Sequence, residues 1–257
     1  MKKLLAVLVA IALVTSIASA QIYVKGGLGY NLSLGGIEIG DNYDGSVSPS
    51  TDEGVYGSYG QGINFSGAIG TKLNDHMKAE LGIGFLIGAT HEVTYKGFTY
   101  STVPPYNSNV PYTDTYKYSS SDFFLNPAIL LTTDIFGAKP YVKFGLIVGI
   151  ASGKREETST EFSGTNTETV SGGILLGFNG AAGAFYAIDN KISLFGELCT
   201  TSGSWSPTKW EYKPHTGVTT SGAFSKKITN STSNTDELQP SYPFGSLGIN
   251  VGIMLSL

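Results

Sequence analysis

The chain has few charged residues and almost no cysteine. Charged residues make up 14% of its 257 residues, whereas a soluble domain usually carries about a quarter. The formal net charge of −4 argues against a nucleic-acid partner, which would require a basic surface. The one cysteine, Cys199, has no partner in the chain, which excludes an internal disulfide and a cysteine-cluster metal site. We expect no metal and no cofactor.

Long hydrophobic runs are also missing beyond the first twenty residues. Residues 1–20 combine a basic start, an apolar run from Leu4 to Val14 and a small-residue site at Ala18-Ser19-Ala20. The run is shorter than the about 20 residues that a membrane-spanning helix needs. These features predict a secretory signal peptide over 1–20, with residues 21–257 as the exported product.

Glycine and aromatic residues are abundant, with 34 Gly, 15 Tyr and 13 Phe. Many lie in segments where apolar residues alternate with small or polar ones. From Met77 to Ala89 every odd position is apolar, and the even positions are mostly glycine or charged. Tyr141 to Ile150 and Leu247 to Leu257 repeat the pattern. Such alternation predicts β-strands with one apolar face.

Each predicted strand has one apolar face, and the composition of its other face distinguishes two kinds of barrel. A soluble barrel has a bulky apolar interior and a charged exterior. Here the second face is mostly Gly, Ser and Asn, which suits a narrow polar lumen and leaves the aliphatic face for lipid. A soluble barrel would leave the aliphatic stripes without a burial partner, so we favour a membrane barrel.

The alternating segments predict an all-β fold, an eight-stranded antiparallel up-and-down transmembrane β-barrel. The strands are expected at 21–34, 61–73, 77–95, 119–133, 139–152, 171–188, 191–203 and 243–257. Short turns at 74–76, 134–138 and 189–190 alternate with long polar loops at 35–60, 96–118, 153–170 and 204–242. This arrangement is typical of outer-membrane barrels, whose long loops are extracellular.

Ten strands are the alternative count. Within the fourth long loop, Trp205–Tyr212 and Ala223–Ile228 are able to pair as a hairpin, either projecting above the rim or adding two spanning strands. Lys226 and Lys227 make a lipid-facing position unfavourable. We therefore favour the projection.

Three of the predicted strand regions carry a family resemblance. Gln21–Tyr30, Lys139–Gly149 and Gly180–Glu197 resemble strands of the opacity-type outer-membrane β-barrel family, which is related in fold to the transmembrane domain of outer membrane protein A. The resemblance covers the strands and none of the long loops. It implies a place in the outer membrane of a Gram-negative bacterium, among its lipids and lipopolysaccharide. Relatives include adhesins, small pores and barrels of unknown role, so it implies architecture rather than activity.

The C-terminal segment resembles a barrel-assembly signal. The pattern polar-x-Gly-x-x-apolar-x-apolar is present as Asn250, Gly252, Leu255 and Leu257. It implies that the barrel-assembly machinery is a partner. The final residue of such signals is usually aromatic, and Leu257 departs from that pattern.

Five charged residues are predicted to face the lumen: Lys25, Lys78, Glu80, Lys143 and Glu197. The lumen of an eight-stranded barrel is about one layer of side chains wide, so we expect these groups to meet as a buried ion-pair cluster. Isolated charges there would be costly. We favour a structural plug over a gate in a narrow ion path.

Catalytic residue types are scarce. The chain has three histidines, His76, His91 and His215. His91 has an acidic neighbour in Glu92, but adjacent strand residues point to opposite faces and cannot form a dyad. We expect no enzymatic activity, and a lipid-modifying enzyme is the least favoured alternative.

The long loops carry many aromatic residues. Tyrosine and tryptophan are frequent binding anchors, and the candidates here are Trp205, Trp210, Tyr212, Tyr106 and Tyr112. The lower aromatics alternatively form the girdle at the membrane boundary. We predict a structural or adhesin-like recognition role toward a host or surface ligand, performed by a monomer. A narrow, porin-like pore for ions or small solutes is the alternative.

Overall fold

The computed structural model describes residues 21–34, 37–100, 109–135, 137–226 and 237–257. The predicted signal peptide lies outside these residues. Every regular element among them is a β-strand. The described part contains no helix that is long and apolar enough to cross a membrane.

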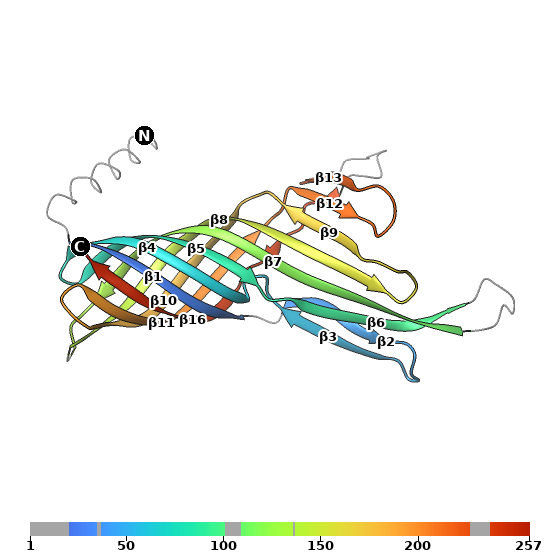
Figure 1. Ribbon diagram of the computed structural model, residues 1–257, viewed down its shortest axis with the longest axis horizontal. Helices are drawn as coiled ribbons and strands as arrows, with labels where there is room; N and C mark the ends of the chain where they lie inside the picture. The colour runs from blue at the N-terminus through green and yellow to red at the C-terminus, as the bar shows by residue number, and fades with distance from the viewer. Residues whose placement is uncertain (1–20, 35–36, 101–108, 136, 227–236) are drawn as a thin grey trace.

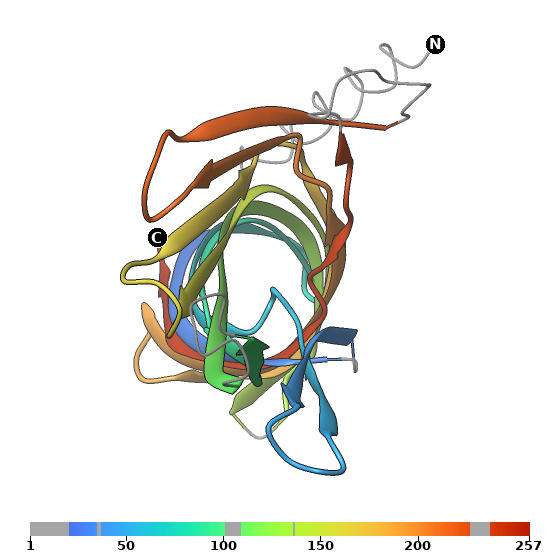
Figure 2. The ribbon, with the colours of Figure 1, turned by 90° about the vertical axis from the view of Figure 1, so that its right-hand side faces the viewer.

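Eight of the strands form a closed antiparallel ring, seen end-on in Figure 2. In order around the ring they are β1 (Ile22–Ser33), β4 (Gly62–Asn74), β5 (Met77–Gly88), β7 (Asn109–Thr132), β8 (Ala138–Ser159), β10 (Leu175–Ala187), β11 (Ile192–Trp205) and β16 (Ser246–Ser256). Each pairs with both neighbours, and β16 pairs with β1. Each predicted strand segment contributes one strand to the ring.

The two faces of the ring differ as the alternation predicts. On β1, Val24, Leu28 and Leu32 are exposed on the outside, whereas Tyr23 and Lys25 are buried inside. The other ring strands continue this exposed aliphatic belt. A belt of this kind is typical of a barrel whose outer wall faces hydrocarbon.

Two ring strands, β7 and β8, continue past one rim into an extension of the same sheet, on the right in Figure 1. We call this extension the outer sheet. The opposite rim carries the short connections, and we call it the turn rim. On one side β7 pairs with β6 (His91–Tyr100), followed by β2 (Ile37–Asp44) and β3 (Thr51–Gly57). On the other side β8 pairs with β9 (Asn166–Ser171), followed by β12 (Lys209–Lys213), β13 (Thr220–Ser225) and the short β14 (Glu237–Leu238). The short β15 (Tyr242–Pro243) pairs with β11.

The outer sheet corrects the prediction of four irregular loops. The segments at 35–60, 96–118, 153–170 and 204–242 contain strands, and β7 begins at Asn109 rather than at 119. These segments are polar on both faces, which made them resemble loops. They are also rich in Tyr and Thr, whose side chains favour strands and pair well across a sheet.

Two predicted boundaries were wrong for local reasons. The strand expected at 77–95 is divided at Ala89 and Thr90 into β5 and β6. The strand expected from 171 begins at Leu175 as β10. Gly172 and Gly173 precede it with φ values of 74° and 73°, a left-handed conformation that favours glycine and turns the chain out of β9.

The hairpin anticipated in the fourth long loop is present, with Lys209 opposite Ala223. Its strand β12 pairs with β9 in the outer sheet, so the hairpin lies outside the ring. Lys227 and Ile228, which were part of that expectation, lie outside the described residues.

A proline interrupts the wall between β7 and β8. Leu125 pairs with Val148 and Ala128 with Gly145, which places Pro127 opposite Leu146. Proline has no N–H to give to the Leu146 carbonyl. The Asn126 side-chain amide donates to that carbonyl instead, over 2.8 Å, and Gly145 leaves room for it because a Cβ there would lie 2.5 Å from the amide nitrogen.

Because the Asn126 side chain replaces a missing backbone donor, we expect the variant Asn126→Ala to be less stable than the wild type. Loss of the amide leaves the part-buried Leu146 carbonyl without a donor, and we expect a decrease of about 1–3 kcal/mol in the free energy of unfolding. Urea titration of the detergent-folded protein measures it. In a Pro127→Ala background the restored N–H should at least halve that cost. An equal cost of Asn126→Ala in the wild type and in Pro127→Ala would contradict the role of Asn126 as a replacement donor.

Candidate functional site

A buried ion-pair cluster occupies the lumen and is centred on Glu197, which is 4% exposed. Its carboxylate lies 3.1 Å from the Lys143 ammonium and 3.4 Å from that of Lys25. The Tyr141 hydroxyl donates to it over 2.6 Å, and the Asn250 amide donates over 3.1 Å. Lys25, Tyr141 and Lys143 reach Glu197 from β1 and β8, which are not adjacent to β11, whereas Asn250 lies directly opposite Glu197 on the neighbouring strand β16.

Lys25 joins this centre to a second carboxylate. Its ammonium lies 3.7 Å from Glu80, which also accepts a hydrogen bond from the Tyr23 hydroxyl over 2.9 Å. Two lysines and two glutamates therefore balance one another in the buried cluster. Pairing of this kind reduces the cost of burying each charge.

Lys78, the fifth predicted member, makes no ion pair within the described part of the chain. Its ammonium lies 4.9 Å from the centre of the Tyr23 ring and 4.6 Å from that of Phe185. This is a cation–π arrangement closer to the turn rim. The prediction of one five-membered ion-pair cluster is wrong for Lys78, because its strand position places it among aromatic rings.

Glycine on neighbouring strands makes space for the rings that hold the cluster. The Tyr23 ring lies against Gly70, and the Tyr141 ring lies against Gly183. A Cβ at either glycine would lie within 3 Å of the ring. The inward glycines are thus required by the tyrosines opposite them.

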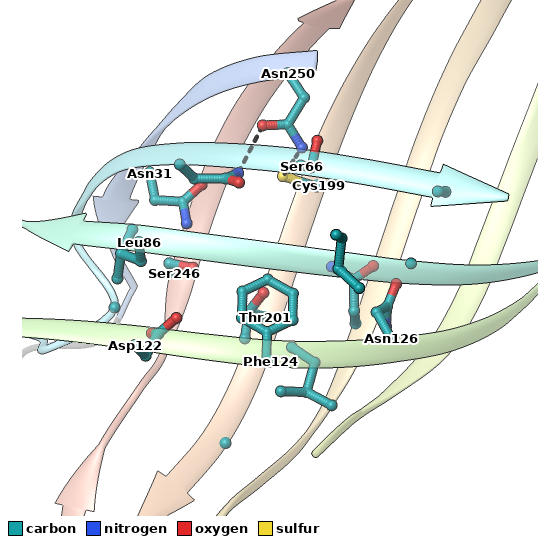
Figure 3. Close-up of a pocket in the computed structure, with 18 of the residues that line it drawn as sticks. Asn31, Ser66, Leu86, Asp122, Phe124, Asn126, Cys199, Thr201, Ser246 and Asn250 are labelled. Carbon is teal, nitrogen blue, oxygen red and sulfur yellow. Dashed lines mark hydrogen bonds between the residues drawn. The ribbon is translucent and has the colours of Figure 1, made fainter. Parts of the chain in front are cut away.

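Two apolar clusters lie in the lumen on either side of the charges. The cluster near the turn rim contains Tyr23, Leu130, Tyr141, Phe185, Phe195 and Met254. The cluster below the outer sheet contains Ile147, Ala151, Val170, Leu175, Trp205 and Phe244. A cavity of about 70 Å³ lies between them, shown in Figure 3. It has room for only a few water-sized particles.

Trp205 belongs to the apolar cluster below the outer sheet and not to an exposed surface. Its side chain is completely buried, and its indole N–H donates to the Gly172 carbonyl over 2.8 Å. Its ring also meets that of Phe244 edge-on at 6.2 Å. The prediction that Trp205 takes part in recognition was therefore wrong, because the alternation of side chains along β11 turns Trp205 inward.

The other predicted recognition residues lie in the outer sheet or outside the described residues. Trp210 and Tyr212 are half-buried on β12, and Tyr112 lies over Gly97 of β6. Tyr106 lies outside the described residues. Among the described aromatic residues of the outer sheet, Tyr56 and Phe98 have the larger exposed fractions, at 60% and 44%.

A polar aromatic cluster in the outer sheet was not anticipated. The Tyr95 and Tyr116 rings meet edge-on at 5.6 Å. The Tyr95 hydroxyl donates to Asp41 over 2.8 Å, and that of Tyr116 donates to Glu157 over 3.2 Å. Burial and the Asp41 hydrogen bond raise the pKa of Tyr95 to about 12, so it stays a neutral donor. The period-two run of Tyr112, Asp114, Tyr116 and Tyr118 was the available signal.

Of the remaining chemical candidates, Glu92 and His215 have partners, whereas the His91 Nε2 atom is buried without a hydrogen-bond partner in the described part of the chain. Glu92 pairs with Lys117 at 3.5 Å and not with His91. His215 stacks on Phe162 at 4.3 Å, and His76 lies in the turn between β4 and β5. Among the described residues no three His, Cys, Asp or Glu side chains come together as a metal site.

The residues of the predicted assembly signal alternate across β16. Asn250 faces the lumen, and a Cβ on Gly252 would collide with the Gly26 carbonyl. Leu255 and Leu257 are exposed, at 44% and 79%. Recognition by assembly machinery stays a prediction, whereas Asn250 also has a structural contact with Glu197.

Comparison with solved structures supports the fold. A major outer membrane protein from Thermus thermophilus is similar over 93% of this chain and 100% of its own, with 13% identity and a TM-score of 0.52. At this identity the likeness shows an outer-membrane β-barrel fold and no more.

Two further alignments are too weak to support an argument. The outer membrane protease OmpT from Escherichia coli aligns over 93% of this chain and 96% of its own, with 10% identity and a TM-score of 0.36. An anion-selective porin from Comamonas acidovorans aligns over 93% and 99%, with 9% identity and a TM-score of 0.11. No protein-family profile matches the chain, and no curated protein does. The resemblance to the opacity-type family stays a prediction.

The central place of Glu197 predicts the effect of Glu197→Gln. The change leaves two buried lysines short of a counter-charge, and we expect a loss of about 3–5 kcal/mol in unfolding free energy. Urea titration in detergent measures it. Glu156→Gln, which breaks an exposed pair with Lys154, is the matched control and should cost less than about 1 kcal/mol. Equal costs would contradict a central role for Glu197.

Proposed function

We propose that this protein is a monomeric bacterial outer-membrane β-barrel of eight spanning strands, without enzymatic activity, whose outer sheet serves surface recognition. The closed ring with an aliphatic outer belt supports insertion into lipid. The Thermus likeness supports the same fold. In this setting the belt contacts outer-membrane lipid, the outer sheet borders lipopolysaccharide, and the barrel-assembly machinery inserts the chain.

The observation that carries the recognition role is the continuity of β7 and β8. Each strand passes from the ring into the outer sheet without interruption, and their pairing extends from Thr132–Tyr141 to Asp114–Ser159. A sheet held in this way presents side chains on a preformed surface, which lowers the entropic cost of binding. The exposed Tyr56 and Phe98 are its candidate anchors.

The closed lumen argues against the pore alternative. Near the turn rim, the rings of Tyr141 and Phe185 stack at 4.4 Å, and Phe195 lies 6.4 Å from Phe185. A packed layer of rings opposes the passage of a hydrated ion, because the ion would have to give up most of its water there. The structural role of the lumen is to hold the ring together.

Closure predicts that the wild-type protein gives no steady conductance in planar bilayers. The double variant Phe185→Ala and Phe195→Ala removes two rings from the layer and should give channel events. A known porin inserted in the same membrane confirms that the assay detects pores. Steady conductance by the wild-type protein would overturn the non-conducting role.

Recognition by the outer sheet predicts a loss of binding on removal of its exposed aromatic residues. We expect the nanodisc-inserted protein to bind one component of a glycan and extracellular-matrix array, and Tyr56→Ser with Phe98→Ser to weaken that binding at least tenfold. Tyr186→Ser, an exposed aromatic at the turn rim, is the matched control. Heat-modifiable mobility on gels checks that each variant folds. Unchanged binding by the double variant would rule out these anchors.

A further inference from the structure

One acidic side chain in the lumen has no counter-charge among the described residues. Asp122 of β7 is 5% exposed and lines the cavity between the two apolar clusters, as Figure 3 shows. Its Oδ1 atom has no hydrogen-bond partner in the described part of the chain. None of the ion pairs formed by the described residues includes Asp122. An unpaired buried carboxylate is costly, so the cavity lacks a compensating group.

The directions of the hydrogen bonds in the lumen leave a second oxygen of this cavity, Asn64 Oδ1, without a donor in the part of the chain that the structure describes. The Glu197 carboxylate only accepts, so the Asn250 amide nitrogen must be the donor to it, over 3.1 Å. The Asn250 oxygen then accepts from the Asn64 amide nitrogen over 2.8 Å. Asn64, which is 6% exposed, is left with a buried Oδ1 atom that has no donor among the described residues.

Two further amide oxygens line the same cavity without a described donor. The Asn179 nitrogen donates to the Thr200 carbonyl over 3.1 Å, which leaves its Oδ1 atom unpaired. The Oδ1 atom of Asn31 is unpaired as well. Four buried atoms along this cavity have no hydrogen-bond partner among the described residues, and all four are carboxylate or amide oxygens, which accept.

The lysines of the lumen do not supply the missing positive charge. Lys25 and Lys143 are held by Glu80 and Glu197. Lys78 lies over the Tyr23 and Phe185 rings in the apolar cluster near the turn rim. Lys25 and Lys143 line the same cavity as Asp122, together with Gly60 and Phe244, but neither lysine forms an ion pair with Asp122.

We propose that this cavity binds one monovalent cation, such as sodium, with Asp122 as its charged ligand and amide oxygens of the surrounding asparagines as neutral ligands. Hard cations take oxygen ligands, and oxygen acceptors are what the cavity offers. One carboxylate balances one positive charge, whereas a divalent ion would leave an excess charge in the lumen. The volume of about 70 Å³ admits an ion and excludes organic ligands.

Such a site makes the stability of the folded barrel depend on which cation is present. An ion held between β7 and the asparagine-bearing strands stabilises the folded ring by mass action, because the unfolded chain has no such cavity. This inference does not depend on the recognition role of the outer sheet. It concerns the part of the lumen that the ion-pair cluster does not neutralise.

Cation-dependent unfolding of the full chain in nanodiscs tests the proposal. Unfolding midpoints are compared in sodium chloride and in N-methylglucamine chloride of equal ionic strength. We expect the wild-type midpoint to rise with the logarithm of sodium concentration above the binding constant. Asp122→Asn should abolish that rise. Glu92→Gln, which removes one exposed negative charge at an ion pair with Lys117, should keep it.

Two outcomes would overturn the cation site. An equal midpoint in sodium and N-methylglucamine would mean that water or a proton satisfies Asp122. An equal sodium response in the wild type and Asp122→Asn would place any bound ion elsewhere.

A second measurement covers the case in which Asp122→Asn does not fold. Crystals of the wild-type protein soaked in thallium(I) should show an anomalous peak inside the cavity, in contact with Asp122. Waters alone at that position would overturn the proposal.

Discussion

The constraint on which this fold depends is that backbone polar groups have no water partner inside a lipid layer. Each unpaired N–H or C=O there costs several kcal/mol. Pairing of β16 with β1 removes the free edges of the ring. The same constraint explains why Asn126 donates to the Leu146 carbonyl where Pro127 cannot. The sheet tolerates a proline in its wall because a neighbouring side chain supplies the missing hydrogen bond.

Closure of eight strands determines what the interior contains. The lumen is so narrow that side chains from opposite walls touch, and every inward group must find a partner. Glu197 does so with two lysines, a tyrosine and an asparagine. Small residues on adjacent strands leave space for the large ones. The result is a packed interior in which charge is neutralised pair by pair, with Asp122 and Lys78 as the exceptions among the described residues.

Beyond the rim the constraint is relaxed, because water satisfies backbone and side-chain groups alike. The strands therefore carry polar residues on both faces, and the outer sheet keeps open edges at β3 and on the β13 side among the described strands. Its tyrosines pair with carboxylates, as in Tyr95 with Asp41. Trp205 and Phe244 separate this hydrated region from the lumen. The division places structure in the ring and leaves the outer sheet free to bind.

The sequence by itself determined which residues face inward, because side-chain direction alternates with a period of two along any strand. It thereby placed Lys25, Glu80, Lys143 and Glu197 in the lumen. Only the tertiary structure decided that Lys78 meets aromatic rings, that Trp205 is buried and that Asp122 has no counter-charge in the described part of the chain. Those outcomes depend on the register between strands distant in the chain, which local alternation does not encode. The polar loops likewise became strands only through pairing with β7 and β8.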